Sequence, residues 1–254
     1  MLQDLADEGL SRSTISRVRS HLTSALDHAV RRRKVRWNVA KGGTMPVIAP
    51  PRKGRALTAD EIVEFKAAAP EDRLGAFFLL GLGTGLRPGE LCGLTWAAVD
   101  LDQATLMVES NLERDSSGAH LGGVKYSTAG ERIVELSPSV VAALRTHRAR
   151  QAQERLSAGP RWSQETPDLI FATVVGTALD YRRVGRRNLA RICRRAGIEG
   201  HVNLYDTRHK VASQMLDAGV PIEKVADSLG NAPVTVARYY RHSVGTVQRA
   251  RLSR

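Results

Sequence analysis

An apolar run at residues 75–86 sets the first limit on what the chain can fold into. It reads GAFFLLGLGTGL, and the polar segment RPGEL follows it. The run is shorter than the roughly 20 residues that a membrane-spanning helix needs, so it predicts a buried helix in a globular core and no membrane span. Glycines at 83 and 85 end this helix, and Pro88 suits the first position of the next one. Arg87 is therefore expected on a turn between two helices.

Helical patterns account for most of the rest of the chain. Residues 11–36 place apolar side chains three and four apart, which indicates an amphipathic helix or a pair of helices. Thr58 and Glu61 form a capping box that opens a helix running through Ala69. Further helices are expected at 138–156, 181–196, 206–218, 221–229 and 233–241.

Two short β-prone runs, 101–110 and 132–136, interrupt the helical pattern. The glycine-rich segment 118–123 is expected to form a turn between the two runs. The polar segment 126–131 is expected to form a turn before the second run. The runs predict a small antiparallel sheet that carries Lys125. The expected fold class is mainly α with a small antiparallel β-sheet, an α+β fold.

A segment without periodicity divides the chain. Residues 41–56 collect Gly, Pro, Lys and Arg, a composition typical of a linker. The length of 254 residues suits one large or two modest domains. We expect a helical fragment at 1–42, a linker at 43–56 and the main domain at 57–254.

The charge of the chain indicates a polyanionic partner. The formal net charge is +12 and the pI is near 10.4, values typical of nucleic-acid-binding proteins. Arginine, which suits bidentate phosphate contacts, supplies 31 of the 38 basic residues, although a GC-rich genome would also favour it. Residues 1–55 hold 12 basic and 4 acidic residues, so this segment is expected to face nucleic acid.

The cysteines and the first residues indicate the compartment. Cys92 and Cys193 lie about a hundred positions apart, which predicts neither a disulfide framework nor a zinc site. The first ten residues hold three acidic and no basic residues, unlike a secretory signal peptide. A cytoplasmic protein without a metal or another cofactor is expected.

Three segments together carry a specific motif pattern. They are TGLRPGEL at 84–91, YDTRHKVASQML at 205–216 and SLGNAPVTVARYYRH at 228–242. In this order they resemble the three conserved blocks of the tyrosine recombinase, or phage integrase, family. The segments WAAVDLDQATLMV at 96–108 and GVKYSTAGERIVEL at 123–136 extend the resemblance through the sheet region.

The resemblance implies a site-specific DNA recombinase. Residues 57–254 would be its catalytic domain, and residues 1–42 would be part of its helical core-binding domain, which contacts DNA. Arg87 and Arg208 correspond to the two catalytic arginines of the family, and Lys125 corresponds to its hairpin lysine. The implied partners are double-stranded DNA and further copies of the chain, assembled as a synaptic tetramer.

The nucleophile follows from a spacing within the third block. In the family the tyrosine lies nine residues after a His or Trp, and counting from Asn231 selects Tyr240 rather than Tyr239. Attack of this tyrosine on a DNA phosphodiester gathers negative charge that two guanidinium groups can stabilise. By the resemblance, a covalent 3′-phosphotyrosine then separates cleavage from rejoining, and Lys125, at the position of the family's hairpin lysine, is expected to protonate the leaving 5′ oxygen.

Two positions depart from the pattern of the family. Tyr205 stands where the family usually has the first His of the second block, and it can still donate a hydrogen bond. Asn231 can donate to phosphate but cannot exchange protons near neutral pH, and it is also interpreted as the N-cap of the following helix. Residues 1–40 match only the last helices of the core-binding domain, so a truncated copy is expected.

Other functions fit parts of the sequence. A recombinase fold that binds DNA with weak or no cleavage is one alternative, and a type IB topoisomerase would share the chemistry. Residues 220–242 also resemble a helix-turn-helix, which would make the protein a transcriptional regulator. A regulator has no use for the arginine motif at 84–91 or for a hairpin lysine.

The charge predicts salt-sensitive DNA binding. Each phosphate contact should add about −0.9 to the slope of log K against log salt, because counterions are released from the duplex. Titrating fluorescent duplex DNA between low and physiological ionic strength measures this slope. A flat salt dependence would contradict the interpretation of the charge.

Overall fold

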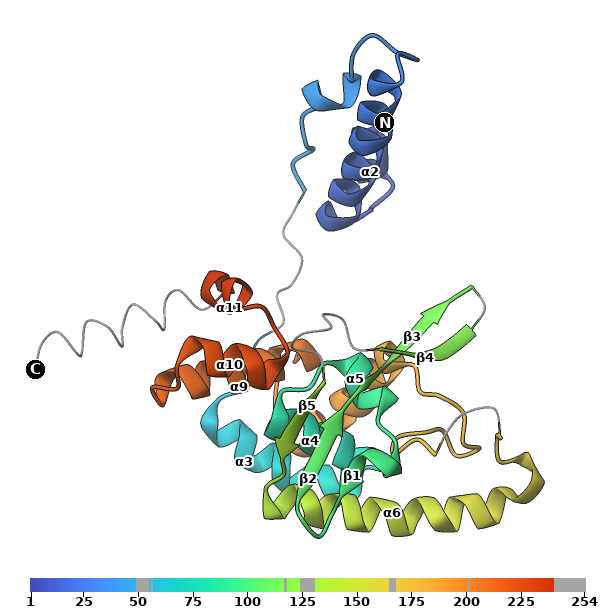
Figure 1. The fold of residues 1–254 in the computed structure, drawn as a ribbon, viewed down its shortest axis with the longest axis vertical. Coiled ribbons are helices and arrows are strands. Elements are labelled where there is room, and N and C mark those ends of the chain that lie inside the picture. The colour runs from blue at the N-terminus through green and yellow to red at the C-terminus, as the bar shows by residue number, and fades with distance from the viewer. Residues whose placement is uncertain are drawn as a thin grey trace, which may run out of the picture. The chain divides into compact units, whose positions relative to one another are not determined.

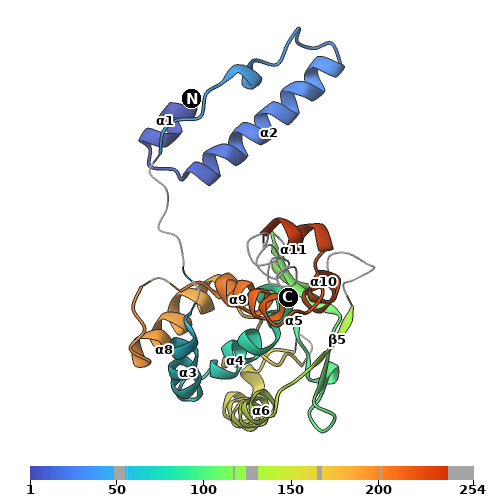
Figure 2. The same ribbon diagram turned by 90° about the vertical axis from the view of Figure 1, so that its left-hand side faces the viewer.

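The computed structural model describes residues 1–48, 55, 57–116, 118–123, 131–164, 168–200 and 202–239. Contacts between residues divide the chain into two compact units, Met1–Lys53 and Gly54–Arg254. The division lies within the segment 43–56, which the composition indicates as a linker. Figures 1 and 2 draw both units.

The smaller unit is built on one long helix. It contains α1 (Leu2–Asp7), α2 (Arg12–Arg31) and the 3-10 turn η1 (Val39–Gly42), which lies back alongside α2 (Figure 2). Asn38 fixes this return. Its Nδ2 donates to the carbonyl of Thr23 and to the Asp27 carboxylate, both at 2.8 Å, and its Oδ1 accepts from the Ala40 N–H.

Helices form the core of the larger unit. The buried helix α4 contacts α5, α6 and α9 and contributes Phe77, Phe78 and Leu80 to the main hydrophobic cluster. The capping box of Thr58 and Glu61 is confirmed, and so are the end of α4 at the glycines and the start of α5 at Pro88. The elements of this part are α3 (Ala59–Ala68), η2 (Ala69–Glu71), α4 (Gly75–Thr84), α5 (Pro88–Gly93), η3 (Trp96–Ala98), α6 (Pro138–Ala158) and η4 (Gly159–Arg161).

The expected antiparallel structure is confirmed, but it forms two sheets. Strands β1 (Val99–Asp100), β2 (Thr105–Val108) and β5 (Arg132–Glu135) form one sheet in the order β1-β2-β5. Strands β3 (Ser110–Asp115) and β4 (Gly118–Gly123) form a separate hairpin, visible in Figure 1.

The interpretation of the glycine-rich segment 118–123 as a turn is wrong. The segment is strand β4, and its Leu121 lies opposite Leu112 of β3. Ladder hydrogen bonds need only the backbone, so the neighbouring strand overrides the weak strand preference of glycine. Lys125 lies outside the described residues.

Helices form the end of the larger unit. Ala212, Leu216, Val225, Leu229 and Val236 belong to a second hydrophobic cluster that joins the last three helices. These helices are α9 (Leu204–Asp217), α10 (Ile222–Leu229) and α11 (Pro233–Tyr239). No helix of the described ranges is long and apolar enough to cross a membrane.

The helix expected at 181–196 contains a wider turn. It runs as α7 (Tyr181–Val184), a π-helical turn η5 (Gly185–Leu189) and α8 (Ala190–Arg195). Buried Val184 and Leu189 are five residues apart, which a π-turn accommodates and a regular helix does not. Asp72, whose side chain is fully buried, accepts hydrogen bonds from Asn188 and Arg191 on this segment.

The structure predicts that Gly85 is intolerant of a side chain. Gly85 ends α4 with φ of +66°, and an added Cβ would lie 2.7 Å from Leu229 Cδ2. Gly197 has nearly the same φ, +67°, with no atom near an added Cβ. Gly197→Ala should cost about 1 kcal/mol for the left-handed backbone, and Gly85→Ala should cost at least about 1 kcal/mol more for the clash.

Urea unfolding of the two glycine variants and the parent measures the difference. Equal losses of stability in both variants would show that the contact between Gly85 and Leu229 is not tight.

Candidate active site

Arg87 lies at the N-terminus of α5, two residues after Gly85, which ends α4. Its guanidinium donates to the Glu90 carboxylate at 2.7 Å, to the carbonyl of Gly230 at 2.5 Å and to Oδ1 of Asn231 at 2.7 Å. Its backbone N–H donates to the second oxygen of Glu90 at 2.8 Å. One quarter of the Arg87 side chain remains exposed, so an external anion can reach it.

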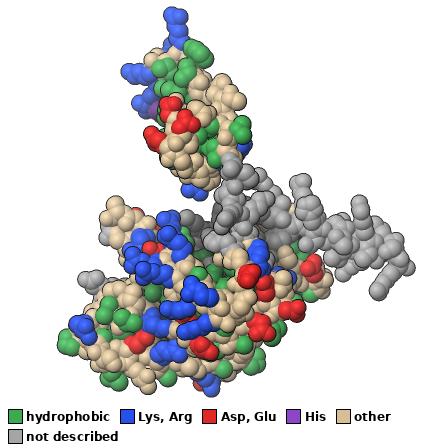
Figure 3. All heavy atoms as spheres, turned by 180° about the vertical axis from the view of Figure 1, so that it is seen from behind, with side chains coloured by type: hydrophobic (Ala, Val, Ile, Leu, Met, Phe, Trp, Pro, Cys, Tyr) green, Lys and Arg blue, Asp and Glu red, His purple; other side chains and the backbone are tan. Residues whose placement is uncertain are grey.

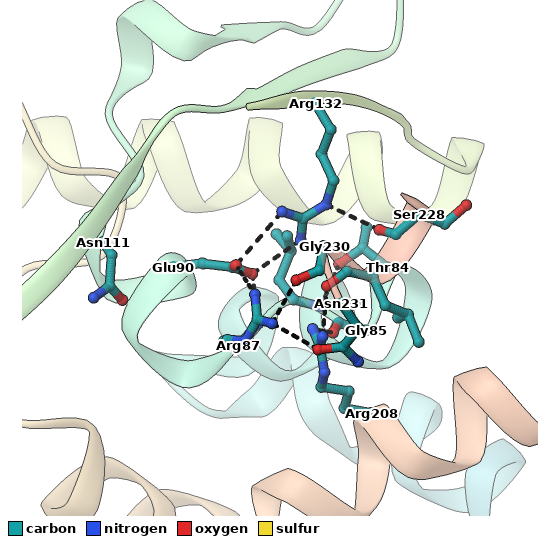
Figure 4. A network of polar contacts seen from close by, with 12 residues as sticks. Thr84, Gly85, Arg87, Glu90, Asn111, Arg132, Arg208, Ser228, Gly230 and Asn231 are labelled. Carbon is teal, nitrogen blue, oxygen red and sulfur yellow. Dashed lines mark hydrogen bonds and ion pairs between the residues drawn. The ribbon is translucent and has the colours of Figure 1, made fainter. Parts of the chain in front are cut away.

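Glu90 is the buried centre of this network (Figure 4). Arg132, the first residue of β5, donates to both of its oxygens, at 3.0 and 3.5 Å. Burial raises the pKa of Glu90, but the hydrogen bonds and charge of Arg132, with smaller contributions from Arg87, outweigh burial and hold the pKa below its ordinary value of 4.5. Glu90 is therefore ionised and fixes the two arginines around it.

Arg208 projects from α9 and is buried. Its guanidinium donates to the carbonyl of Gly85 at 2.7 Å and to the carbonyl of Leu229 at 2.5 Å. Both carbonyls belong to the C-terminal ends of helices, which carry partial negative charge. Figure 4 shows that Arg208 and Arg87 approach the same chain segment at Gly230 and Asn231.

The interpretation of Asn231 as a helix N-cap is wrong. Helix α11 begins at Pro233, so the residue that precedes it is Ala232. The Asn231 side-chain oxygen instead accepts from Arg87, and its backbone N–H donates to the carbonyl of Ala226 at 2.8 Å. Gly230 has φ of +59°, and this left-handed residue directs Asn231 toward the arginines and away from α11.

The structure brings together three of the six residues selected from the sequence, namely Arg87, Arg208 and Asn231. Tyr205 lies on α9 less than one turn before Arg208, but its side chain lies outside the described part. Lys125 and Tyr240 also lie outside it.

Sequence reasoning missed Glu90 and Arg132. Glu90 had a signal, because it stands three residues after Arg87 at the start of a helix. Arg132 had none, since its contacts depend on the packing of β5 against distant segments.

The network carries an excess of positive charge. Among the described contacts, Arg87 and Arg132 share the single carboxylate of Glu90. The other acceptors of these two arginines and of Arg208 are neutral, namely backbone carbonyls and the side-chain oxygen of Asn231. Such a site can bind an anion such as a phosphodiester.

Neither metal nor thiol chemistry is indicated by the described residues. Within them, no three His, Cys, Asp or Glu side chains gather as metal ligands would. Burial raises the pKa of the Cys92 thiol to about 12, so this thiol is not a nucleophile at neutral pH.

Replacing Glu90 should have a pH-dependent effect on stability. Since its pKa is lowered on folding, the stabilising effect of the carboxylate is present above pH 4.5 and is lost as the pH falls through the lowered pKa. Glu90→Gln should therefore cost about 3 kcal/mol at neutral pH, because charged arginines lose their buried partner. The cost should shrink below pH 4.5. Thermal unfolding of both proteins across this range tests the prediction, and a pH-independent difference would contradict it.

Comparison with known proteins finds relatives that are integrases or tyrosine recombinases. The model of the phage integrase family matches residues 55–245. A protein named tyrosine recombinase XerC-like from Caldanaerobacter subterraneus subsp. tengcongensis is 28% identical over 255 residues, which cover 94% of this chain and 65% of that protein. An integrase from Streptomyces ambofaciens is also 28% identical, over 94% of this chain and 62% of its own length. The chain thus spans somewhat less than two thirds of these two curated relatives.

Solved structures share the fold. The Tn1549 transposon integrase in complex with a circular intermediate DNA has a TM-score of 0.79 at 20% identity, over 99% of this chain and 83% of that one. A lambda integrase dimer bound to a core site has a TM-score of 0.62 at 20% identity, over 94% and 76% of the two chains. Since the family model covers most of the chain, the protein belongs to the phage integrase family, the tyrosine recombinases.

Proposed function

We propose that the protein is a site-specific DNA recombinase that cleaves and rejoins DNA strands through a 3′-phosphotyrosine intermediate. The observation that carries the proposal is the convergence of Arg87 and Arg208 on the segment that ends α10, where Asn231 joins them. Two arginines held by one segment are suited to contact one phosphate group. Membership of the family supplies the reaction class.

The proposed reaction begins when the Tyr240 hydroxyl loses its proton to solvent and its oxygen attacks the phosphorus of the scissile phosphodiester. The bond from phosphorus to the 5′ oxygen breaks, and Lys125 gives this oxygen its proton. Arg87 and Arg208 stabilise the negative charge that gathers on the nonbridging oxygens. In the second step the 5′ hydroxyl of a partner strand attacks the phosphotyrosine and releases the tyrosine. The cycle conserves the number of phosphodiester bonds and needs no cofactor.

Asn231 has two functions in this proposal. Its Oδ1 accepts from Arg87 and so fixes the guanidinium. Its Nδ2 is a donor that can contact a phosphate oxygen, as the family's His or Trp would. Tyr205 is assigned a similar hydrogen-bonding role, by its position in the second motif.

Arginines exposed on α7, η5 and α8 are proposed to hold the duplex. Among the described contacts, Asp72 binds Arg191, whereas no side-chain hydrogen bond or ion pair engages the side chains of four other exposed arginines: Arg183, Arg186, Arg187 and Arg194. Cations without a carboxylate partner are free to bind phosphates. Seen from behind, the larger unit displays a concentration of Lys and Arg side chains (Figure 3).

The remaining assignments follow the family. We assign residues 1–42 to the helical core-binding domain, 43–56 to a linker and 57–254 to the catalytic domain. Double-stranded DNA is the proposed substrate, and copies of the chain are proposed to assemble on it, as a lambda integrase tetramer does on a Holliday junction. The cytoplasm is the proposed compartment.

Adduct formation tests the function. The probe is a nicked duplex carrying a site that the parent protein selects from a random-sequence pool, and the adduct is detected on a denaturing gel. The parent and Tyr239→Phe should form a covalent adduct, whereas Tyr240→Phe should form none, because only the Tyr240 hydroxyl attacks phosphorus.

The opposite pattern in the two tyrosine variants would show that Tyr239 is the nucleophile. Specific binding without an adduct in the parent would favour a recombinase fold that binds DNA and does not cleave it.

A further inference from the structure

Three consecutive carbonyls at the end of α10 accept hydrogen bonds from three different arginines. Ser228 accepts from Arg132 Nε at 2.9 Å, Leu229 from Arg208 Nη2 at 2.5 Å and Gly230 from Arg87 Nη2 at 2.5 Å. The last carbonyls of a helix have no partner within the helix and carry its negative dipole end. The end of α10 therefore orients three guanidinium groups at once.

Arg132 differs from the other two arginines. It lies outside the three motifs of the family and is not assigned to the reaction. Its side chain is 9% exposed and joins three elements, since it begins β5, binds Glu90 of α5 and binds the Ser228 carbonyl. Its backbone is also held in the sheet, opposite Val108 of β2.

In this arrangement Arg132 fixes the position of groups that orient the other two arginines. Glu90 is held by Arg132 on one side and contacts Arg87 on the other. Without Arg132, Glu90 would be held by Arg87 alone, and the Ser228 carbonyl at the end of α10 would lose its hydrogen bond to β5. The Leu229 and Gly230 carbonyls, which orient Arg208 and Arg87, would then lose their fixed position.

We propose that Arg132 is a positioning residue for DNA cleavage, which anchors the end of α10 to β5 and α5 and thereby aligns Arg87 and Arg208 on one phosphate. The proposal rests on the proposed recombinase function. By its described contacts, Arg132 acts through Glu90 and through the Ser228 carbonyl of α10. A planar fork is needed because one guanidinium must reach a carboxylate and a carbonyl together.

The test compares Arg132→Ala and Arg132→Lys with the parent. Arg145→Ala is the matched control, because Arg145 pairs with the exposed Asp102 on the surface of α6 and β1–β2. Three quantities are measured on the full chain: the rate constant of adduct formation on the selected nicked duplex, the Kd for the same duplex, and hydrogen exchange of the amides at 226–236 and, for comparison, in α6.

Arg132→Ala should slow adduct formation by about a hundredfold, the scale expected when reacting groups shift by about 1 Å. Its Kd should stay at the parent value, and exchange should be faster at Gly230 and Asn231 but not in α6. Arg132→Lys should fall between alanine and the parent, since it keeps the charge and loses the fork. Arg145→Ala should match the parent in all three measurements.

The results that contradict the positioning role of Arg132 differ from those that contradict the recombinase function. Parent-like adduct formation in Arg132→Ala would overturn the proposal, and so would parent-like behaviour of Arg132→Lys, because charge alone would then suffice. If the parent forms no adduct, the recombinase function itself fails. Exchange then still decides the anchoring: faster exchange in Arg132→Ala supports it, and unchanged exchange overturns it.

Discussion

The site depends on the meeting of two helix ends, one at Gly85 and the other at Gly230. Both glycines are left-handed, and each stops its helix where the other approaches. Arg208 joins the two ends because its guanidinium donates to a carbonyl of each. The C-terminal ends of both helices carry partial negative charge and would repel each other. The positive guanidinium between them offsets this repulsion and is attracted to both ends. Arg87 follows the first helix end and Asn231 follows the second. The contact between the two ends therefore sets the distance between Arg87 and Asn231.

The parts of the fold that sequence could predict are those determined locally. The end of α4, the start of α5 at Pro88 and the capping box at Thr58 each depend on a few neighbouring residues. The conformation of β4 depends on its pairing with β3, and the preference of its own residues misled the prediction.

The same distinction holds within the site. The motifs selected Arg87, Arg208 and Asn231, but the partner of Asn231 is 144 positions away, which no local pattern reveals. The cap interpretation was reasonable from sequence, since asparagine is a good N-cap. It failed because α11 begins at Pro233, one residue later than the cap position of Asn231 requires, and because the Asn231 side-chain oxygen accepts from Arg87 instead. Arg132 could not be selected at all, because its importance arises from two contacts across the fold.

The π-turn at 185–189 has a consequence for how the arginine-rich segment 181–195 can vary in length. A π-turn is a helical turn with one additional residue. The additional residue lengthens the exposed side of the turn, while the buried residues on either side stay on the core side. Val184 and Leu189 keep their places in the core, while the residues between them bulge outward. Removing one residue between them would leave a spacing of four, which a regular helix accommodates, so both could keep their places in the core. Such a deletion would shorten only the exposed arc, which carries Arg186 and Arg187, so the turn is a point where the arginine-rich surface can change in length on an unchanged core.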